Sequence, residues 1–198
     1  MVSANEYSLL LLAGGKNSRM GQPKPELVFR NKSFLDHMLD KGHSLGIQRC
    51  YISGYATNRQ DVTTVWDIYP DRGPLGGLHA CMKVMQTPYC LVLPVDAPTL
   101  PMDILVELLK QHQSMPNKDT VLIWEHGDRK EPLIAVYPVA MAATIEELIR
   151  PGSAPVFRAL DRWEHTFFRM ELARDIAINI NTPELYQAII QQDKNDFG

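Results

Sequence analysis

Several features that identify common protein classes are missing from this chain of 198 residues. Its three cysteines are an odd number without a CxxC spacing, so we expect neither a disulfide framework nor a zinc site. The six histidines form no HExxH motif and no i,i+4 pair, which argues against a zinc hydrolase.

Long apolar runs and an excess of positive charge are missing too. The longest plainly aliphatic run near the N-terminus, Leu9 to Ala13, is far shorter than the ~20 residues that cross a bilayer. The segment Met1 to Ser8 contains Glu6 and no basic residue, unlike a secretory signal. A net charge of −3 argues against a broad nucleic-acid surface. We therefore expect a cytoplasmic protein that binds neither membrane nor nucleic acid.

The composition, with 45% apolar and 22% charged residues, predicts one globular domain over 1–198 with its core at about 7–192. Strand-like apolar runs alternate with amphipathic helical patterns that begin near Ser33, Pro74 and Pro101. This alternation predicts an α/β fold, Rossmann-like and doubly wound, with a mainly parallel sheet flanked by helices. The strand-like runs of this first half are 7–13, 48–54, 62–68 and 89–95.

The second half is less regular, and we interpret it as an elaboration of one sheet edge. A turn at 126–128 joins two expected strands, a break follows at 150–152, and Thr182-Pro183 opens a last helix. The other expected elements here are strands at 120–124, 132–137, 166–172 and 176–180 and a helix at 140–148.

Ligands of open α/β sheets bind beyond the carboxyl ends of the strands, and four loops fall there. In the first, Gly14 and Gly15 let backbone N–H groups approach an anion, while Arg19 and Lys24 add positive charge. The loop is no P-loop, because Gln22-Pro23 follows Gly21. The alternative is a tight turn with two solvated cations.

The second loop contains Asp67 and Asp71 and leads into a helix through GPLGGL at 73–78. These acids could accept hydrogen bonds from ribose hydroxyls or from base N–H groups. A helix that simply begins at Pro74 after a solvated turn is the alternative.

The third and fourth loops add an acid and two amides. Asp96 directly follows a buried strand, a common position for a magnesium-binding carboxylate, although it could instead fix the turn before Pro98. In the fourth loop, Asn181 or Thr182 would be an ordinary helix cap, whereas Asn179 has no such role.

The motifs together resemble a known family. The segment LLAGGKNSRMGQPK at 11–24 resembles the LAGGxSxRMGxxK signature of nucleotidyltransferases with a glycosyltransferase-A-like Rossmann core, the nucleotide-diphospho-sugar transferase-like fold. With GPLGGL, LPVDAPTLP at 93–101 and NINTPEL at 179–185, the chain is similar to molybdenum cofactor guanylyltransferases, the MobA family. The four motifs follow the family's order over roughly residues 7–192.

The resemblance implies transfer of GMP from GTP to the terminal phosphate of Mo-molybdopterin, with Mg²⁺ and release of pyrophosphate. Further implied partners are other molybdenum-cofactor biosynthesis proteins and molybdoenzyme chaperones. Arg19, Lys24 and Asp96 match catalytic positions, and Asp96 matches the metal ligand. The matched nucleotide-binding positions are Leu12, Ala13, Gly14, Gly15, Lys24, Ser53, Asp67 or Asp71, and Asp96, and the pterin-side positions are Asn179 and Asn181.

The chain departs from the family at two places. Pro25-Glu26 follows Lys24, where a small residue and a leucine are common, and Ser53 stands where the family often has Asn. The alternatives are a cytidylyltransferase that uses CTP, and a catalytically silent nucleotide-binding accessory protein, to which Pro25-Glu26 would point. A sugar-1-phosphate nucleotidyltransferase fits NINTPEL poorly.

Overall fold

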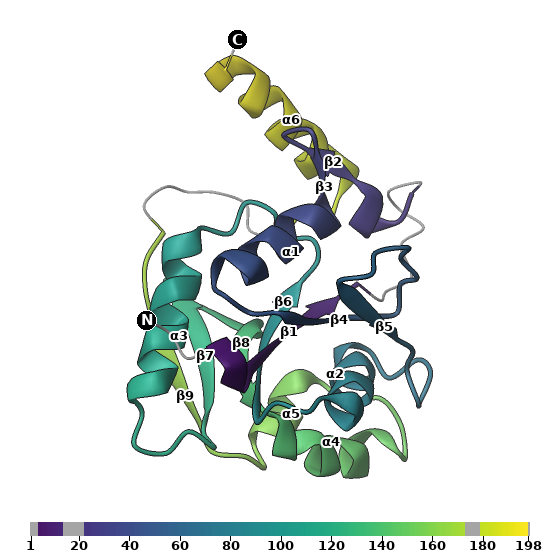
Figure 1. The fold of residues 1–198 in the computed structure, drawn as a ribbon, viewed down its shortest axis with the longest axis vertical. Helices are drawn as coiled ribbons and strands as arrows, with labels where there is room; N and C mark the ends of the chain where they lie inside the picture. The colour runs from purple at the N-terminus through teal and green to yellow at the C-terminus, as the bar shows by residue number, and fades with distance from the viewer. Residues whose placement is uncertain (1–3, 14–21, 173–178, 198) are drawn as a thin grey trace.

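The protein is built around a seven-stranded β-sheet, seen in a computed structural model that describes residues 4–13, 22–172 and 179–197 (Figure 1). The strands of this sheet are β1 (Tyr7–Leu12), β4 (Arg49–Ser53), β5 (Val62–Val65), β6 (Tyr89–Pro94), β7 (Val121–His126), β8 (Arg129–Pro138) and β9 (His165–Arg169). Their order across the sheet is β5-β4-β1-β6-β8-β7-β9. No helix in these described ranges is long and apolar enough to cross a membrane.

The sheet is mainly parallel, as the sequence predicts. Neighbouring strands run parallel at every pairing except the two that β8 makes with β6 and β7. From β1 the chain proceeds to β4 and β5 on one side and returns to β6 on the other, so the strand order reverses between β1 and β6. A reversal of this kind opens a crevice at the carboxyl ends of the strands.

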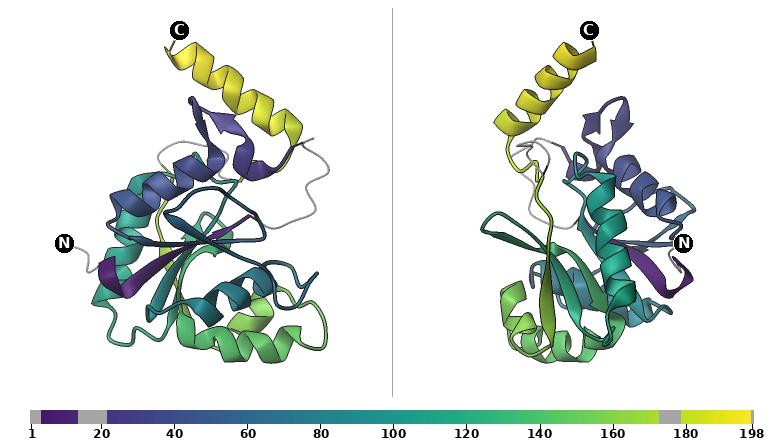
Figure 2. Two further views of the ribbon diagram at one scale, coloured as in Figure 1. Left: turned by 45° about the vertical axis from the view of Figure 1, so that its right-hand side comes forward. Right: turned by 90° about the vertical axis from the view of Figure 1, so that its left-hand side faces the viewer.

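Helices cover both faces of the sheet. Figure 1 and the left view of Figure 2 show α1 on one face and α2 with α4 on the other. The helices are α1 (Phe34–Ser44), α2 (Pro74–Val84), α3 (Met102–Ser114), α4 (Ala142–Ile149), α5 (Val156–Leu160) and α6 (Pro183–Phe197), with short 3-10 turns η1 (Ala4–Glu6), η2 (Lys24–Glu26) and η3 (Val139–Met141).

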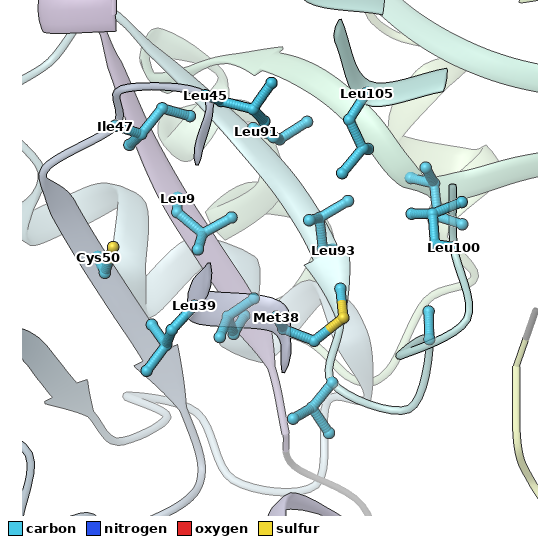
Figure 3. Close-up of a cluster of buried hydrophobic side chains, with 14 of the residues drawn as sticks. Leu9, Met38, Leu39, Leu45, Ile47, Cys50, Leu91, Leu93, Leu100 and Leu105 are labelled. Carbon is cyan, nitrogen blue, oxygen red and sulfur yellow. The ribbon is translucent and has the colours of Figure 1, made fainter. Parts of the chain in front are cut away.

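The apolar run of β1 is buried on both of its faces. Leu9 and Leu11 belong to the cluster under α1 and α3, whereas Leu10 packs into the cluster under α2 and α4. Figure 3 shows Leu9 among Met38 and Leu39 of α1. Because successive side chains of a strand point to opposite faces, a central parallel strand needs a continuous apolar run.

Local signals in the sequence set several helix ends. The Ser33 hydroxyl accepts a hydrogen bond from the Asp36 backbone N–H at 3.0 Å and so caps α1. Gly46, with φ at 83°, follows the end of this helix. Pro74 is the first residue of α2, and the Thr182 hydroxyl accepts from the Leu185 N–H at 3.2 Å at the start of α6.

A third, smaller cluster fixes the C-terminal helix. Phe29 and Phe34 pack with Ile180 and Ile189, so α6 lies beside the hairpin of β2 (Val28–Phe29) and β3 (Lys32–Ser33), as both ribbon figures show. The Tyr186 hydroxyl also donates to the Val28 carbonyl at 2.8 Å. This contact holds the residues just before α6 close to the carboxyl edge of the sheet.

The structure corrects several element boundaries. The strand expected at 62–68 ends at Val65, because the segment turns out of the sheet toward α2. The hairpin around residues 126–128 is longer than expected, and the helix expected at 140–148 is η3 followed by α4. Of the strand expected at 176–180, residues 176–178 lie outside the described residues and 179–180 are not in a strand.

Leu9→Ala should destabilise the fold by about 2–5 kcal/mol, because Leu9 is fully buried and truncation leaves a cavity against α1. Urea unfolding followed by circular dichroism measures the change. Val28→Ala is the control, since Val28 is 49% exposed and should change stability little. Equal losses in the two variants would contradict this account of the core.

Candidate active site

A pocket of about 630 Å³ lies at the carboxyl ends of β1, β4 and β6. Every predicted site residue that the structure describes lines this pocket. Its lining is Leu12, Ala13, Lys24, Ser53, Asp67, Asp71, Gly73, Pro74, Gly77, Pro94, Val95, Asp96, Glu131, Pro132, Leu133, Asn179 and Asn181. Gly14, Gly15 and Arg19 lie outside the described residues.

Backbone hydrogen bonds extend the sheet into the floor of this pocket. The Ala13 N–H donates to the Ser53 carbonyl at 3.2 Å, and the Val95 N–H donates to the Leu12 carbonyl at 3.0 Å. The ends of β4, β1 and β6 are thereby held side by side. Leu12 and Ala13 form the middle of the floor, where the strand order reverses.

One end of the pocket holds Ser53 against Asp67. The Ser53 hydroxyl donates to Asp67 Oδ1 at 3.2 Å. Burial is the main influence on this aspartate and raises its pKa above the usual range, while the Ser53 hydrogen bond and the charge of His79 act in the opposite direction. Asp67 is therefore a partly desolvated acceptor that faces a cavity.

Two glycines of GPLGGL make this close approach possible. A Cβ on Gly77 would lie 2.3 Å from Ser53 Oγ and 3.0 Å from a Leu12 methyl carbon. A Cβ on Gly76 would lie 2.9 Å from Asp67 Oδ2. The glycines at these positions are thus required by the packing of α2 against the pocket floor, beyond any role in the turn.

The other end of the pocket is organised around Lys24. Its ammonium contacts the Asp96 carboxylate and donates to Asn181 Oδ1 at 2.6 Å. Lys24 and Asp96 side chains are only 14% and 11% exposed. The Ile180 N–H donates to the Asp96 carbonyl at 2.9 Å, so the loop before α6 is fastened to the loop after β6.

Near the Lys24 end of the pocket, the Asn179 side chain has an amide oxygen without a hydrogen-bond donor among the described residues. Its Oδ1 atom is buried and has no hydrogen-bond partner among the described residues. Buried polar atoms are normally paired, so this oxygen is suited to receive a donor from a ligand. The sequence singled out Asn179 because no helix-capping role accounts for it.

The structure keeps both candidate aspartates of the second loop at the pocket. Asp67 is half-buried against Ser53, whereas Asp71 is exposed and has a left-handed backbone with φ at 58°. The geometry therefore favours Asp67 as the acceptor that faces the interior, with Asp71 at the rim.

The loop from Gly127 to Glu131 is expected near the pterin side of the pocket, but sequence reasoning did not assign Pro132 and Leu133 to the site. They lie at the start of β8, the antiparallel strand next to β6, so their carboxyl-edge location follows from strand direction. The turn at 126–128 was recognisable, but which side of the hairpin faces the pocket was not.

The charge balance of the described lining is strongly negative. Four acids, Asp67, Asp71, Asp96 and Glu131, face a single described cation, Lys24. Among the described residues no group of three or more histidine, cysteine or acidic side chains could hold a metal. One carboxylate, such as that of Asp96, is enough to hold Mg²⁺ where phosphate oxygens and waters complete the ligand set, the usual arrangement for magnesium at nucleotide sites.

The departure at Pro25-Glu26 leaves the pocket intact. Pro25 is buried within η2, and Glu26 is absent from the lining. The Tyr55 hydroxyl donates to Glu26 Oε1 at 2.9 Å on the exposed side of the turn. The negative charge that the sequence placed near Lys24 is therefore directed elsewhere.

Comparison with known proteins agrees with this geometry. Residues 9–167 match the family model described as "MobA-like NTP transferase domain". A "Molybdenum cofactor guanylyltransferase" of Pseudomonas syringae pv. syringae is 30% identical over 92% of both chains, and one of Xanthomonas euvesicatoria is 29% identical over 98% of this chain and 99% of its own. The crystal structure of molybdopterin-guanine dinucleotide biosynthesis protein A from Archaeoglobus fulgidus covers 95% of this chain and 99% of its own, with 23% identity and a TM-score of 0.76, and shares the fold.

Gly77→Ala should weaken nucleotide binding about tenfold, one tenfold step being about 1.4 kcal/mol, because the added methyl group forces the Ser53 hydroxyl away from Asp67. Isothermal titration calorimetry with GTP measures the affinity. Gly152→Ala is the matched control, since a Cβ there meets no atom within 4 Å. Unchanged affinity in Gly77→Ala would show that this end of the pocket does not contact the nucleotide.

Proposed function

Because the chain belongs to the family of MobA-like NTP transferase domains, we propose that it transfers GMP from GTP to the terminal phosphate of Mo-molybdopterin. The reaction forms the molybdopterin guanine dinucleotide and releases pyrophosphate. The observation that carries the proposal is the convergence of loops from β1, β5, β6 and the start of α6 on one pocket, with an acceptor at one end and an ion pair at the other.

The Asp67 end is the proposed base site. Guanine presents two adjacent N–H donors on its Watson–Crick edge, and an ionised carboxylate is an acceptor-only group that suits them. Cytosine presents one amino donor beside a ring-nitrogen acceptor, which would oppose a carboxylate oxygen. This contrast supports GTP over CTP, with Ser53 holding Asp67 in place and Leu12 and Ala13 as the floor.

The Lys24 end is the proposed phosphate site. Both substrates bring several negative charges into a lining that is already acidic, so neutralisation is the main requirement for catalysis. Lys24 would move from Asp96 toward the triphosphate, with Arg19 as a second cation in the family pattern. Asp96 would hold Mg²⁺, which when bound supplies positive charge to the phosphate oxygens and stabilises the leaving pyrophosphate.

The proposed chemical step is an in-line displacement at the α-phosphorus of GTP. An oxygen of the acceptor phosphate attacks the α-phosphorus in line, and the bond from the α-phosphorus to the bridging oxygen of pyrophosphate breaks. The acceptor phosphate is already ionised near neutral pH, so no general base is needed. No histidine is among the described lining residues, in keeping with this mechanism. Asn179 and Asn181 would contact the pterin side.

Two alternatives differ in what they predict. A cytidylyltransferase would use the same phosphate end but a different base contact at Asp67. A silent nucleotide-binding protein would lack transfer, yet the feature that suggested it, Glu26, points out of the pocket toward Tyr55. The cytoplasmic location and the biosynthetic and chaperone partners expected from the sequence stay predictions.

Transfer from α-labelled GTP to Mo-molybdopterin is the direct test. We expect label in the dinucleotide product with GTP and Mg²⁺, little with CTP, and none after chelation of the divalent cation. Chromatography of the product measures it. Transfer from CTP alone would reverse the base assignment, and GTP binding without transfer to verified acceptor would favour the silent protein.

Lys24→Met should lower kcat by about 10²–10³-fold, the usual loss when one group that stabilises transition-state charge is removed. Single-turnover kinetics of labelled GTP measures the effect. The matched control is Lys32→Met, because Lys32 is exposed and paired with Asp40 outside the pocket. A pure loss of affinity with normal kcat would assign Lys24 to ground-state binding only.

A further inference from the structure

His79 is a buried titratable residue that the proposed reaction does not use. It lies in α2, is 1% exposed, and follows Gly76 by three residues, which places both on the same face of the helix. Gly76 is the residue whose Cα lies against the Asp67 carboxylate. His79 is therefore located directly behind the proposed base site, although it does not line the pocket.

On the side away from the pocket, His79 faces Glu146 of α4. The distance from His79 Nε2 to Glu146 Oε2 is 3.4 Å. The Tyr69 hydroxyl and an Arg150 guanidinium N–H each donate to Glu146 Oε1 at 3.0 Å. These hydrogen bonds, with the one from Arg150 the strongest influence, lower the pKa of Glu146 to about 2, so this carboxylate stays ionised.

On the pocket side, the charge of His79 acts on Asp67. Burial raises the pKa of Asp67, and apart from the Ser53 hydrogen bond the opposing influence comes from His79. Neither His79 ring nitrogen forms a hydrogen bond to another described residue, and the ring lies beside that of Tyr69, with 5.6 Å between the ring centroids. Glu146, whose carboxylate stays ionised, is thus one neighbour of the imidazole, and Asp67 is the group on the pocket side on which its charge acts.

We propose that His79 is a positioning residue for guanine recognition, which keeps Asp67 ionised and directed into the pocket through the line of groups Glu146, His79 and Asp67. This inference rests on the proposed function, in which Asp67 accepts the N–H groups of guanine. His79 itself does not touch the substrate. The ligand class concerned is a nucleotide whose base offers N–H donors to a carboxylate.

The sign of the pH effect follows from Asp67. A carboxylate accepts the base only while it is ionised, so affinity is lost as the pH falls through its pKa. Removal of His79 raises that pKa further, and the loss then begins at a higher pH. The other titratable or charged groups around His79 and Glu146 are Tyr69 of the loop that contains Asp67, Lys83 of α2, Arg150 directly after α4, and Arg72, which donates to the Ile149 carbonyl at 2.8 Å.

The test compares His79→Gln with the wild-type protein by calorimetric GTP affinity from pH 8.0 to 5.5. We expect near-equal affinity at pH 8.0 and a loss that grows steadily as the pH falls toward 5.5, with about tenfold as its upper limit for a pKa difference of one unit. The phosphates of GTP titrate identically for both proteins, so their effect cancels in the ratio of affinities. A loss that is constant with pH, or no loss, would overturn the inference and leave His79 a packing residue.

Two further variants make the result specific. His43→Gln is the matched control, because this histidine is paired with Asp61 at 3.8 Å outside the pocket and should give a flat ratio. Glu146→Gln should also make the loss of GTP affinity begin at a higher pH, as His79→Gln does. Because the Glu146 side chain is partly exposed, this variant is expected to fold even if the buried His79→Gln variant is unstable. A flat ratio for Glu146→Gln would also contradict the inference. If wild-type protein binds no GTP at any pH, the proposed function fails and the inference fails with it.

Discussion

The parallel pairing of β1 with both β4 and β6 is the constraint on which the rest of the site depends. It brings the ends of three strands to one edge, and the hydrogen bonds from Ala13 to Ser53 and from Val95 to Leu12 continue that alignment beyond the strands. Loops that are far apart in the chain then share one pocket. The pocket exists because the strand order reverses at β1, not because of any single loop.

Close approach and charge divide the pocket into two chemically different ends. At the first, Gly76 and Gly77 let α2 lie against Asp67 and Ser53, which gives a partly desolvated acceptor suited to a neutral base edge. At the second, the Lys24 ammonium contacts the buried Asp96 carboxylate and the exposed Asn181 amide oxygen, so a cation stands at the phosphate end. The proposed reaction needs both: one end selects the nucleotide and the other neutralises its phosphates.

The acidic lining of the pocket means that phosphate binding requires additional positive charge. Four carboxylates of the described lining face one described lysine, so a triphosphate bound there needs further positive charge, which Arg19 and a divalent cation would supply in the proposed reaction. In the proposed site Asp96 would hold this cation through a carboxylate oxygen, a ligand type that magnesium prefers. Behind the pocket, His79 and Glu146 lie 3.4 Å apart, and in our proposal this pair helps to keep Asp67 ready to accept the base.

The sequence by itself determined the α/β alternation, the helix starts at Ser33 and Pro74, and the loop motifs that contain Lys24, Asp67 and Asp96, because these depend on local periodicity, capping and short spacings. Only the tertiary structure decided which groups meet. The contact of Lys24 with Asn181, separated by 157 residues, and the inclusion of Leu133 in the lining depend on the order of distant strands in the sheet. The antiparallel direction of β8 and the contact of His79 in α2 with Glu146 in α4 likewise arise from packing between elements, which no local pattern encodes.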